Sequence, residues 1–197
     1  MKFEKISESI SHSEWKKQGI GAVIMDMQPN LMDTIHEAKQ LTESIILQMK
    51  VLNLLQIPIC LTEQAPEKLG STHPDIINQN TQGICFRKKT FSAFGSDAFS
   101  KWIETNEISH LLVSGIETPI CIYQTSVDAL RMKLKVTLLS DCIGARRETD
   151  STEVQKQLRA FGCTIIPLET LTYSYLRDSN HLHFRDISKL IRERTQA

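Results

Sequence analysis

The sequence predicts an α/β fold, a three-layer α/β/α sandwich in which helices cover both faces of a parallel sheet. Short apolar runs rich in β-branched residues alternate with longer stretches of helical period, as in strands joined by crossover helices. The first run, 20–26, is almost continuously apolar, as a strand buried on both faces should be. With 197 residues, 41% of them hydrophobic and 23% charged, the chain fits a single domain over residues 1–197.

The elements follow in order along the chain. The first strand, 20–26, ends in a carboxylate, and apolar positions every three or four residues predict a long helix over 34–55. The second strand is 57–62, and the polar stretch 63–73, which contains proline and glycine, predicts a loop. The later elements are strands at 84–88, 109–114, 135–139 and 163–166, and helices at about 96–104, 121–132, 155–161 and 188–194.

Charge and cysteine content exclude several classes of protein. Lys plus Arg and Asp plus Glu both number 23, so the chain lacks the basic excess with which nucleic-acid binders neutralise phosphates, and we expect no nucleic-acid partner. Five cysteines, an odd number, argue against a secreted disulfide framework and favour a cytoplasmic protein. The charged segment 1–19 predicts no signal peptide, and no apolar run approaches the roughly 20 residues that cross a bilayer, so we expect no membrane association.

Three reactive side chains follow different strands of the predicted sheet. Asp26 follows the first strand, Lys89 the third, and Cys121 begins the helix after the fourth. Ligands of open parallel sheets bind beyond the carboxyl ends of the strands, where these residues fall. A helix N-terminus and a nearby ammonium both lower the pKa of a thiol, and a carboxylate can take its proton. We therefore expect Cys121 to titrate below its usual range, with the Lys89 ammonium needed in addition to the helix N-terminus.

Each of these residues also has a purely structural interpretation. A single cysteine in such a fold is most often a buried small hydrophobe, which is what we expect of the other four, Cys60, Cys85, Cys142 and Cys163. Asp26 alone could be a turn carboxylate, and Lys89 alone a solvated surface lysine. Only their joint placement favours chemistry.

Other sites have little support. Neither a Gly-x-Gly-x-x-Gly nor a Gly-x-x-x-x-Gly-Lys-[Ser/Thr] motif is present, so we expect no cofactor. His181 and His183 lack a third ligand at a suitable spacing, so we expect no metal. The chain also lacks the Gly-x-Ser-x-Gly elbow of many serine hydrolases.

Four stretches of the chain, in their order, spacing and strand-end context, resemble the isochorismatase-like cysteine hydrolase family. They are 22–28, 89–94, 115–121 with 124–130, and 139–142. Within the family, the isochorismatase-domain-containing subgroup is the most similar, through further stretches at 61–64, 66, 69–70, 176–178 and 183–187.

The resemblance implies a six-stranded parallel sheet in order 3-2-1-4-5-6, in which strands one and four lie side by side. It implies a nucleophile at Cys121, a general acid/base at Asp26 and a supporting lysine at Lys89. It also implies a non-proline cis peptide bond at Ile116–Glu117, and an oxyanion hole made by the backbone N–H groups of Glu117 and Cys121. The implied reaction is attack on an amide-like carbonyl, loss of the amine and hydrolysis of the thioester.

Two departures narrow the expected activity. Metal-dependent nicotinamidases of the family carry an Asp-x-His motif after strand two, where this chain has Thr62-Glu-Gln64. Isochorismatases proper lack the cysteine that this chain has at 121. Some relatives of the subgroup are labelled ribonucleases, yet the neutral charge and only three Tyr and two Trp provide little for binding and stacking RNA.

We therefore predict a cofactor-independent cysteine hydrolase that cleaves a C–N bond of a small amide or ureide. Gln64, Phe91 and Phe94 are the candidate substrate-binding residues, although each could equally pack against a neighbouring subunit. The alternatives are a catalytically silent interaction protein of the same fold, or the ribonuclease named for some relatives. We expect a small-molecule substrate and a homo-oligomer, either a dimer or a tetramer.

Overall fold

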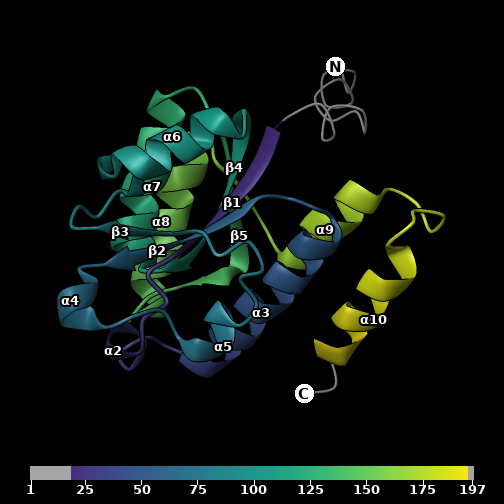
Figure 1. Cartoon of the computed structure of the whole chain (residues 1–197), viewed down its shortest axis with the longest axis horizontal. Helices are drawn as coiled ribbons and strands as arrows, with labels where there is room; N and C mark the ends of the chain where they lie inside the picture. Colours follow the sequence, from purple (N-terminus) through teal and green to yellow (C-terminus); the bar gives the residue numbers. More distant parts are fainter. Residues whose placement is uncertain (1–18, 195–197) are drawn as a thin grey trace.

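A computed structural model describes residues 19–194 of the chain, and its centre is a six-stranded parallel sheet in the order β3-β2-β1-β4-β5-β6 (Figure 1). This confirms the fold class that the sequence predicts and the strand order that the family resemblance implies. We expect no signal peptide in residues 1–19, and all of these except Gly19 lie outside the described residues. The strands are β1 (Gly19–Met25), β2 (Ile59–Gln64), β3 (Cys85–Lys88), β4 (Ile108–Ile116), β5 (Lys135–Gly144) and β6 (Thr164–Ile166).

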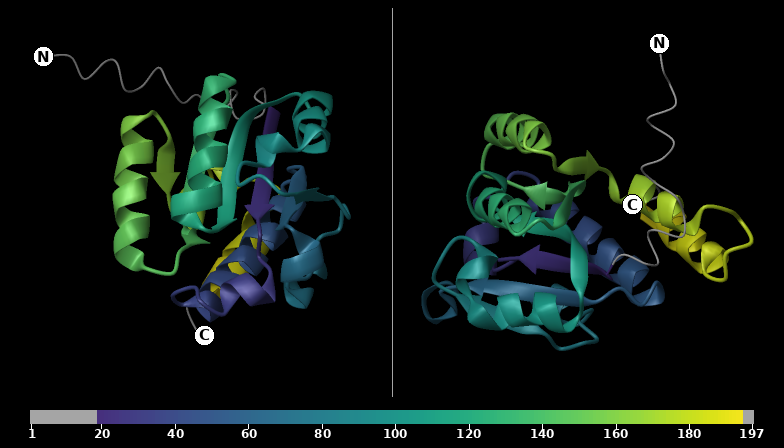
Figure 2. Two further views of the ribbon diagram at one scale, coloured as in Figure 1. Left: turned by 90° about the vertical axis from the view of Figure 1, so that its left-hand side faces the viewer. Right: turned by 90° about the horizontal axis from the view of Figure 1, so that it is seen from above.

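Helices pack on both faces of the sheet (Figure 2). One hydrophobic core lies between the sheet and α3, α9 and α10, and a second between the sheet and α6, α7 and α8. Over residues 19–194, no helix is both long enough and apolar enough to cross a membrane. The helices are α2 (Pro29–Met32), α3 (Ala38–Leu54), α4 (Pro66–Leu69), α5 (Pro74–Ile77), α6 (Asp97–Thr105), α7 (Tyr123–Arg131), α8 (Glu148–Ala160), α9 (Leu168–Leu176) and α10 (Phe184–Arg194).

Several elements differ in extent from the prediction. The helix expected from 34 begins at Ala38, because Glu37 before it adopts a left-handed conformation with φ of 52°. The helix expected from 155 begins at Glu148. Its first turns are polar and bury little beyond Ser151, so the sequence shows no apolar period that would predict them. The strand expected to end at 139 continues to Gly144, after an irregularity in its pairing with β4.

The close approach of β1 and β4 positions the site. Gly115 near the end of β4 pairs with Met25 at the end of β1 and has a φ of 102°. A Cβ atom there would collide with the backbone of Met25, so only glycine fits both the conformation and the space. The two strands therefore stay paired up to the edge where their polar side chains begin.

Candidate active site

Asp26 lies directly after β1, at the carboxyl end of this central strand, and its side chain is fully buried. Its backbone is left-handed, with φ of 56°, and its N–H donates to the carbonyl of Thr62 at 3.0 Å. The hydroxyl of Thr62 donates to Asp26 Oδ1 at 2.7 Å. The neighbouring strand β2 thus fixes both the backbone and one carboxylate oxygen, which leaves Oδ2 for a second partner.

That partner is Lys88, the last residue of β3, and not the predicted Lys89. Lys88 Nζ lies 2.7 Å from Asp26 Oδ2 and 3.6 Å from Cys121 Sγ, and its side chain has no exposed surface. Lys89 is exposed to solvent. The assignment of the site lysine to Lys89 is therefore wrong by one residue.

Strand geometry explains the shift. Successive side chains of a strand point to opposite faces, so a displacement of one residue exchanges the buried and the solvated position. Phe86, two residues before Lys88, packs its ring against Phe99 and Trp102 with centroids 6.0 and 6.3 Å apart, on the same side as Lys88. The alternation of Phe86 and Lys88 was the sequence signal that could have located the buried lysine.

Cys121 lies in one turn of π-helix, Thr118–Ile122, that leads into α7. Its side chain is almost fully buried, with 7% of the residue surface exposed. The peptide bond Ile116–Glu117 before this turn is cis, as the family resemblance implied. The thiol therefore meets the Asp26–Lys88 pair from the turn that follows β4, at the switch point of the sheet.

The expected lowering of the Cys121 pKa is wrong. Burial, the largest cause, and the nearby Asp26 carboxylate together raise the pKa of the thiol to about 12, against the opposing effect of the Lys88 ammonium. The hydrogen bond between the thiol and Asp26 also favours the protonated form. Desolvation outweighs the helix N-terminus and the ammonium, and it depends on how deeply the turn is buried, which the sequence does not show.

Two glutamines, Gln64 at the end of β2 and Gln28 after β1, form hydrogen bonds next to the Asp26–Lys88 pair. Gln64 Oε1 accepts a hydrogen bond from Lys88 Nζ at 2.7 Å, and Gln64 Nε2 donates to the carbonyl of Lys89 at 2.8 Å. Buried Gln28 accepts from the Gln64 N–H at 2.8 Å and donates to the carbonyls of Gln64 and Gly70. Sequence reasoning missed Gln28, which nothing in the local pattern distinguishes from a turn residue after β1.

A cavity of about 300 Å³ opens above the thiol. Phe91 and Gln64 line it, as expected of substrate-binding candidates, but Phe94 does not. The ring of Phe94 instead packs edge-on against buried Phe99 with centroids 5.0 Å apart. The lining residues are Asp26, Leu31, Gln64, Ala65, Lys68, Leu69, Phe91, Ile116, Glu117, Ile120 and Cys121.

The other cysteines lie away from this cavity. Cys60, Cys142 and Cys163 are buried, as predicted for small hydrophobes. Cys85 is exposed, which contradicts the prediction, because it occupies the edge strand β3 and not the interior of the sheet. None of the described cysteines forms a disulfide with another.

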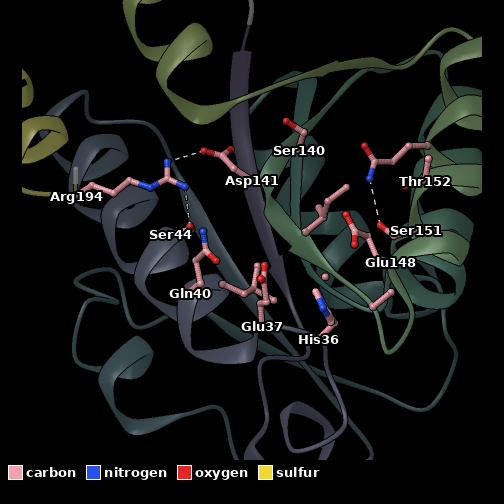
Figure 3. Close-up of a pocket in the computed structure, with 15 residues that line it drawn as sticks. His36, Glu37, Gln40, Ser44, Ser140, Asp141, Glu148, Ser151, Thr152 and Arg194 are labelled. Carbon is pink, nitrogen blue, oxygen red and sulfur yellow. Dashed lines mark hydrogen bonds and ion pairs between the residues drawn. The ribbon is translucent and has the colours of Figure 1, made fainter. Parts of the chain in front are cut away.

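A second, polar cavity of about 230 Å³ lies between the start of α3, the end of β5 and the start of α8 (Figure 3). Arg194 enters from α10 and donates to Asp141 at 2.6 Å and to Ser44 at 2.9 Å. This cavity contains no cysteine or lysine, and its arginine is already paired. Within residues 19–194, no group of three or more His, Cys, Asp or Glu side chains is placed to hold a metal ion.

Comparison with known proteins identifies the family of this chain. The family model for the isochorismatase domain matches residues 21–170. The chain belongs to the isochorismatase family. The match includes Asp26, Lys88 and Cys121 and ends before α10.

Individual relatives extend the comparison. Isochorismatase domain-containing protein 2A of Mus musculus is 31% identical over 170 residues, which cover 86% of this chain and 81% of the relative. The structure of MAR1 ribonuclease from Caenorhabditis elegans superimposes with a TM-score of 0.82 at 24% identity, covering 87% of this chain and 88% of that one. The pyrazinamidase of Pyrococcus horikoshii in complex with zinc has a TM-score of 0.67 at 16% identity, covering 76% and 99%. The chain thus has the isochorismatase-family hydrolase fold.

Proposed function

We propose that this protein is a cofactor-independent cysteine hydrolase that cleaves a C–N bond of a small amide or ureide through a thioester intermediate. One observation carries the proposal: a buried ammonium, Lys88, contacts a carboxylate and a thiol together at the base of a cavity. Of the similar proteins, the pyrazinamidase is by its name an amide hydrolase. Cys121 is the nucleophile, Asp26 the acid and base, and Lys88 the electrostatic support.

In the first half-reaction, the Cys121 sulfur attacks the carbonyl carbon while its proton passes to the Asp26 carboxylate. Because the thiol pKa is about 12, the proton transfer accompanies the attack rather than preceding it. The backbone N–H groups of Glu117 and Cys121 stabilise the oxyanion. Asp26 then protonates the leaving nitrogen, the C–N bond breaks, and an acyl thioester remains on Cys121.

In the second half-reaction, Asp26 removes a proton from water as the water oxygen attacks the thioester carbonyl. The C–S bond breaks, the acid product leaves, and the proton held by Asp26 returns to the sulfur. Lys88 stays charged throughout and offsets the negative charge that moves between sulfur and carboxylate. The cycle needs neither an oxidant nor a metal ion.

The test is ammonia release from a panel of small primary amides and ureides. We expect turnover by the wild type and by Cys85→Ser, which removes the exposed cysteine on β3, and none by Cys121→Ser. Intact-mass spectrometry should show an acyl adduct on the wild type and on Cys85→Ser, but not on Cys121→Ser. Turnover that persists in Cys121→Ser would refute the nucleophile.

The similar Caenorhabditis elegans structure is named as a ribonuclease, so RNA cleavage is the second activity to measure. A labelled RNA incubated with the same variants should remain intact. Cleavage of RNA by the wild type, with no ammonia from any amide, would replace the proposed function, and inactivity in both assays would favour the catalytically silent interaction protein.

A further inference from the structure

We propose that the cavity above Cys121 takes an uncharged amide whose acyl group is compact and apolar, and that Leu31, Leu69, Phe91 and Ile120 form the surface that selects it. This inference rests on the proposed cysteine hydrolase function and specifies its substrate class. The evidence is the division of the cavity into a reactive polar base and a carbon-lined wall.

The wall is assembled from separate segments of the chain. Leu31 comes from α2, Leu69 from α4, Phe91 from the loop after β3, and Ile120 from the π-helical turn. Leu31 and Ile120 also pack against the two hydrophobic cores, one on each face of the sheet. Half of Phe91 is exposed, so its ring has surface left for a ligand to cover.

The polar groups at the base are already committed to one another. The Gln64 amide uses Oε1 on Lys88 and Nε2 on the carbonyl of Lys89. The Asp26 carboxylate is held by Thr62 and Lys88. A charged substituent on the substrate would therefore lose its water without finding a partner, which is costly.

The charged groups nearer the opening do not change this conclusion. The Glu117 carboxylate is paired with Arg146 at 2.9 Å, so it is not free to bind a substrate ammonium. Lys68 lies on α4 and is exposed, so its ammonium stays in water at the rim. A substrate whose carboxylate reached Lys68 is the competing possibility, and the experiment distinguishes it.

The volume limits the size of the substrate. At about 30 Å³ for each small group, the volume share of a liquid water molecule, a cavity of 300 Å³ holds about ten non-hydrogen atoms. An amide with an acyl chain of four to seven carbons would fill this space, and a much larger one would extend past Phe91 into solvent.

The experiment compares kcat/KM for ammonia release from amides of equal size and different charge. The neutral 4-methylpentanamide is matched with succinamate, which is anionic, and hexanamide with 5-aminopentanamide, which is cationic. We expect each neutral amide to exceed its charged match at least 100-fold. Along the series from acetamide to hexanamide, kcat/KM should rise about fourfold per buried methylene.

Variants of the wall and of the rim test the assignment. Phe91→Ser should reduce the ratio of hexanamide to acetamide kcat/KM at least tenfold, because it removes part of the apolar surface. The proposal is overturned if succinamate is the better substrate and Lys68→Met removes that preference. It is equally overturned if Phe91→Ser leaves the ratio unchanged.

A reagent experiment tests the cavity without turnover. Cys85 is exposed on the edge strand β3, outside the cavity, so it serves as an internal reference for the intrinsic reactivity of the two reagents. We expect N-butyl iodoacetamide to alkylate Cys121 at least ten times faster than iodoacetate, after normalisation to the same ratio at Cys85. If no amide is hydrolysed but this ratio holds, the proposed function fails and the apolar cavity stands. If amides are hydrolysed and the ratio is near one, the substrate class fails alone.

Discussion

Lys88 lies between a carboxylate and a thiol, and its ammonium lowers the Cys121 pKa against the effects of burial and Asp26. Replacing it with methionine removes that opposition, so we expect Lys88→Met to slow iodoacetamide alkylation of Cys121 at pH 8 at least tenfold. Lys89→Met is the matched control, because its ammonium is exposed, and its rate should stay within twofold of wild type. Peptide mass spectrometry measures both rates.

The stability of these variants needs a parallel measurement. Removing one partner of a buried ion pair typically costs about 3–5 kcal/mol, so Lys88→Met must be shown to be folded by circular dichroism at the assay temperature. If folded Lys88→Met reacts as fast as wild type, the lysine does not act on the thiol.

Asp26→Asn should have the opposite effect on alkylation. The Asp26 carboxylate raises the Cys121 pKa both by its charge and by its hydrogen bond, so the amide should speed alkylation at pH 8. Ammonia release should fall by about 10²–10⁴-fold, the usual worth of a general acid/base. Unchanged alkylation together with unchanged turnover would show that Asp26 neither perturbs the thiol nor transfers its proton.

Sequence reasoning located two members of this group but not the third. Asp26 and Cys121 follow strands whose ends are marked by a sharp change from apolar to polar residues. Lys88 and Lys89 are adjacent and chemically identical, and the one local signal that separates them is the alternation along β3, which places Lys88 on the same side as Phe86. The pKa of Cys121 was beyond the sequence for a similar reason, since it depends on burial.

At the scale of elements, Asp141 holds three parts of the fold together. On β5, its Oδ1 accepts from the Leu168 N–H at the start of α9 at 2.8 Å, and its Oδ2 accepts from Arg194 of α10 at 2.6 Å. We expect Asp141→Ala to lower the free energy of unfolding by about 1–3 kcal/mol, because both donors lose their acceptor. Urea denaturation would measure it.

Arg194→Met provides the graded comparison. It removes the link to α10 but keeps the bond from α9, so it should cost less than Asp141→Ala. Equal losses in the two variants would mean that the bond to Leu168 contributes no more than the Arg194–Ser44 bond, which only Arg194→Met removes.

The sequence predicts the strands more accurately than it predicts the helices that follow β5. Buried parallel strands are continuous apolar runs, which the sequence shows directly. Helix α9 (Leu168–Leu176) was missed, although it contributes Leu168, Leu171 and Leu176 to a core. Its position depends on a bond from distant Asp141, which no local pattern reveals.

For the whole molecule, buried His110 couples stability to pH. Desolvation, together with the nearby charge of Lys135, lowers the pKa of His110 to about 4, against an ordinary 6.5. The unfolded chain therefore binds more protons than the native protein between these values, so the protein loses stability as the pH falls from about 6.5 to about 4. At pH 5 the loss from this residue is about 2 kcal/mol.

His110→Gln removes the titration while keeping a hydrogen-bonding group near Thr137 Oγ1, which lies 2.8 Å from His110 Nε2. Urea unfolding at pH 7 and at pH 5 should show a smaller pH effect in the variant. The same change in both proteins would assign the acid sensitivity to other groups. The homo-oligomer stays a prediction, which light scattering would test.

The pairing of charges around the cavity has a kinetic consequence. Asp26 is neutralised by Lys88 and Glu117 by Arg146, in a chain whose formal net charge is zero. Such a surface has little field with which to guide a ligand from a distance, so encounter with an uncharged substrate is governed by ordinary diffusion. We expect kcat/KM for a neutral amide to change less than twofold between about 20 mM and about 500 mM salt, since screening has little to act on. The same assay with succinamate tests the field itself, because only a charged substrate can be screened, and a steep decline of its kcat/KM with ionic strength would reveal long-range attraction of anions.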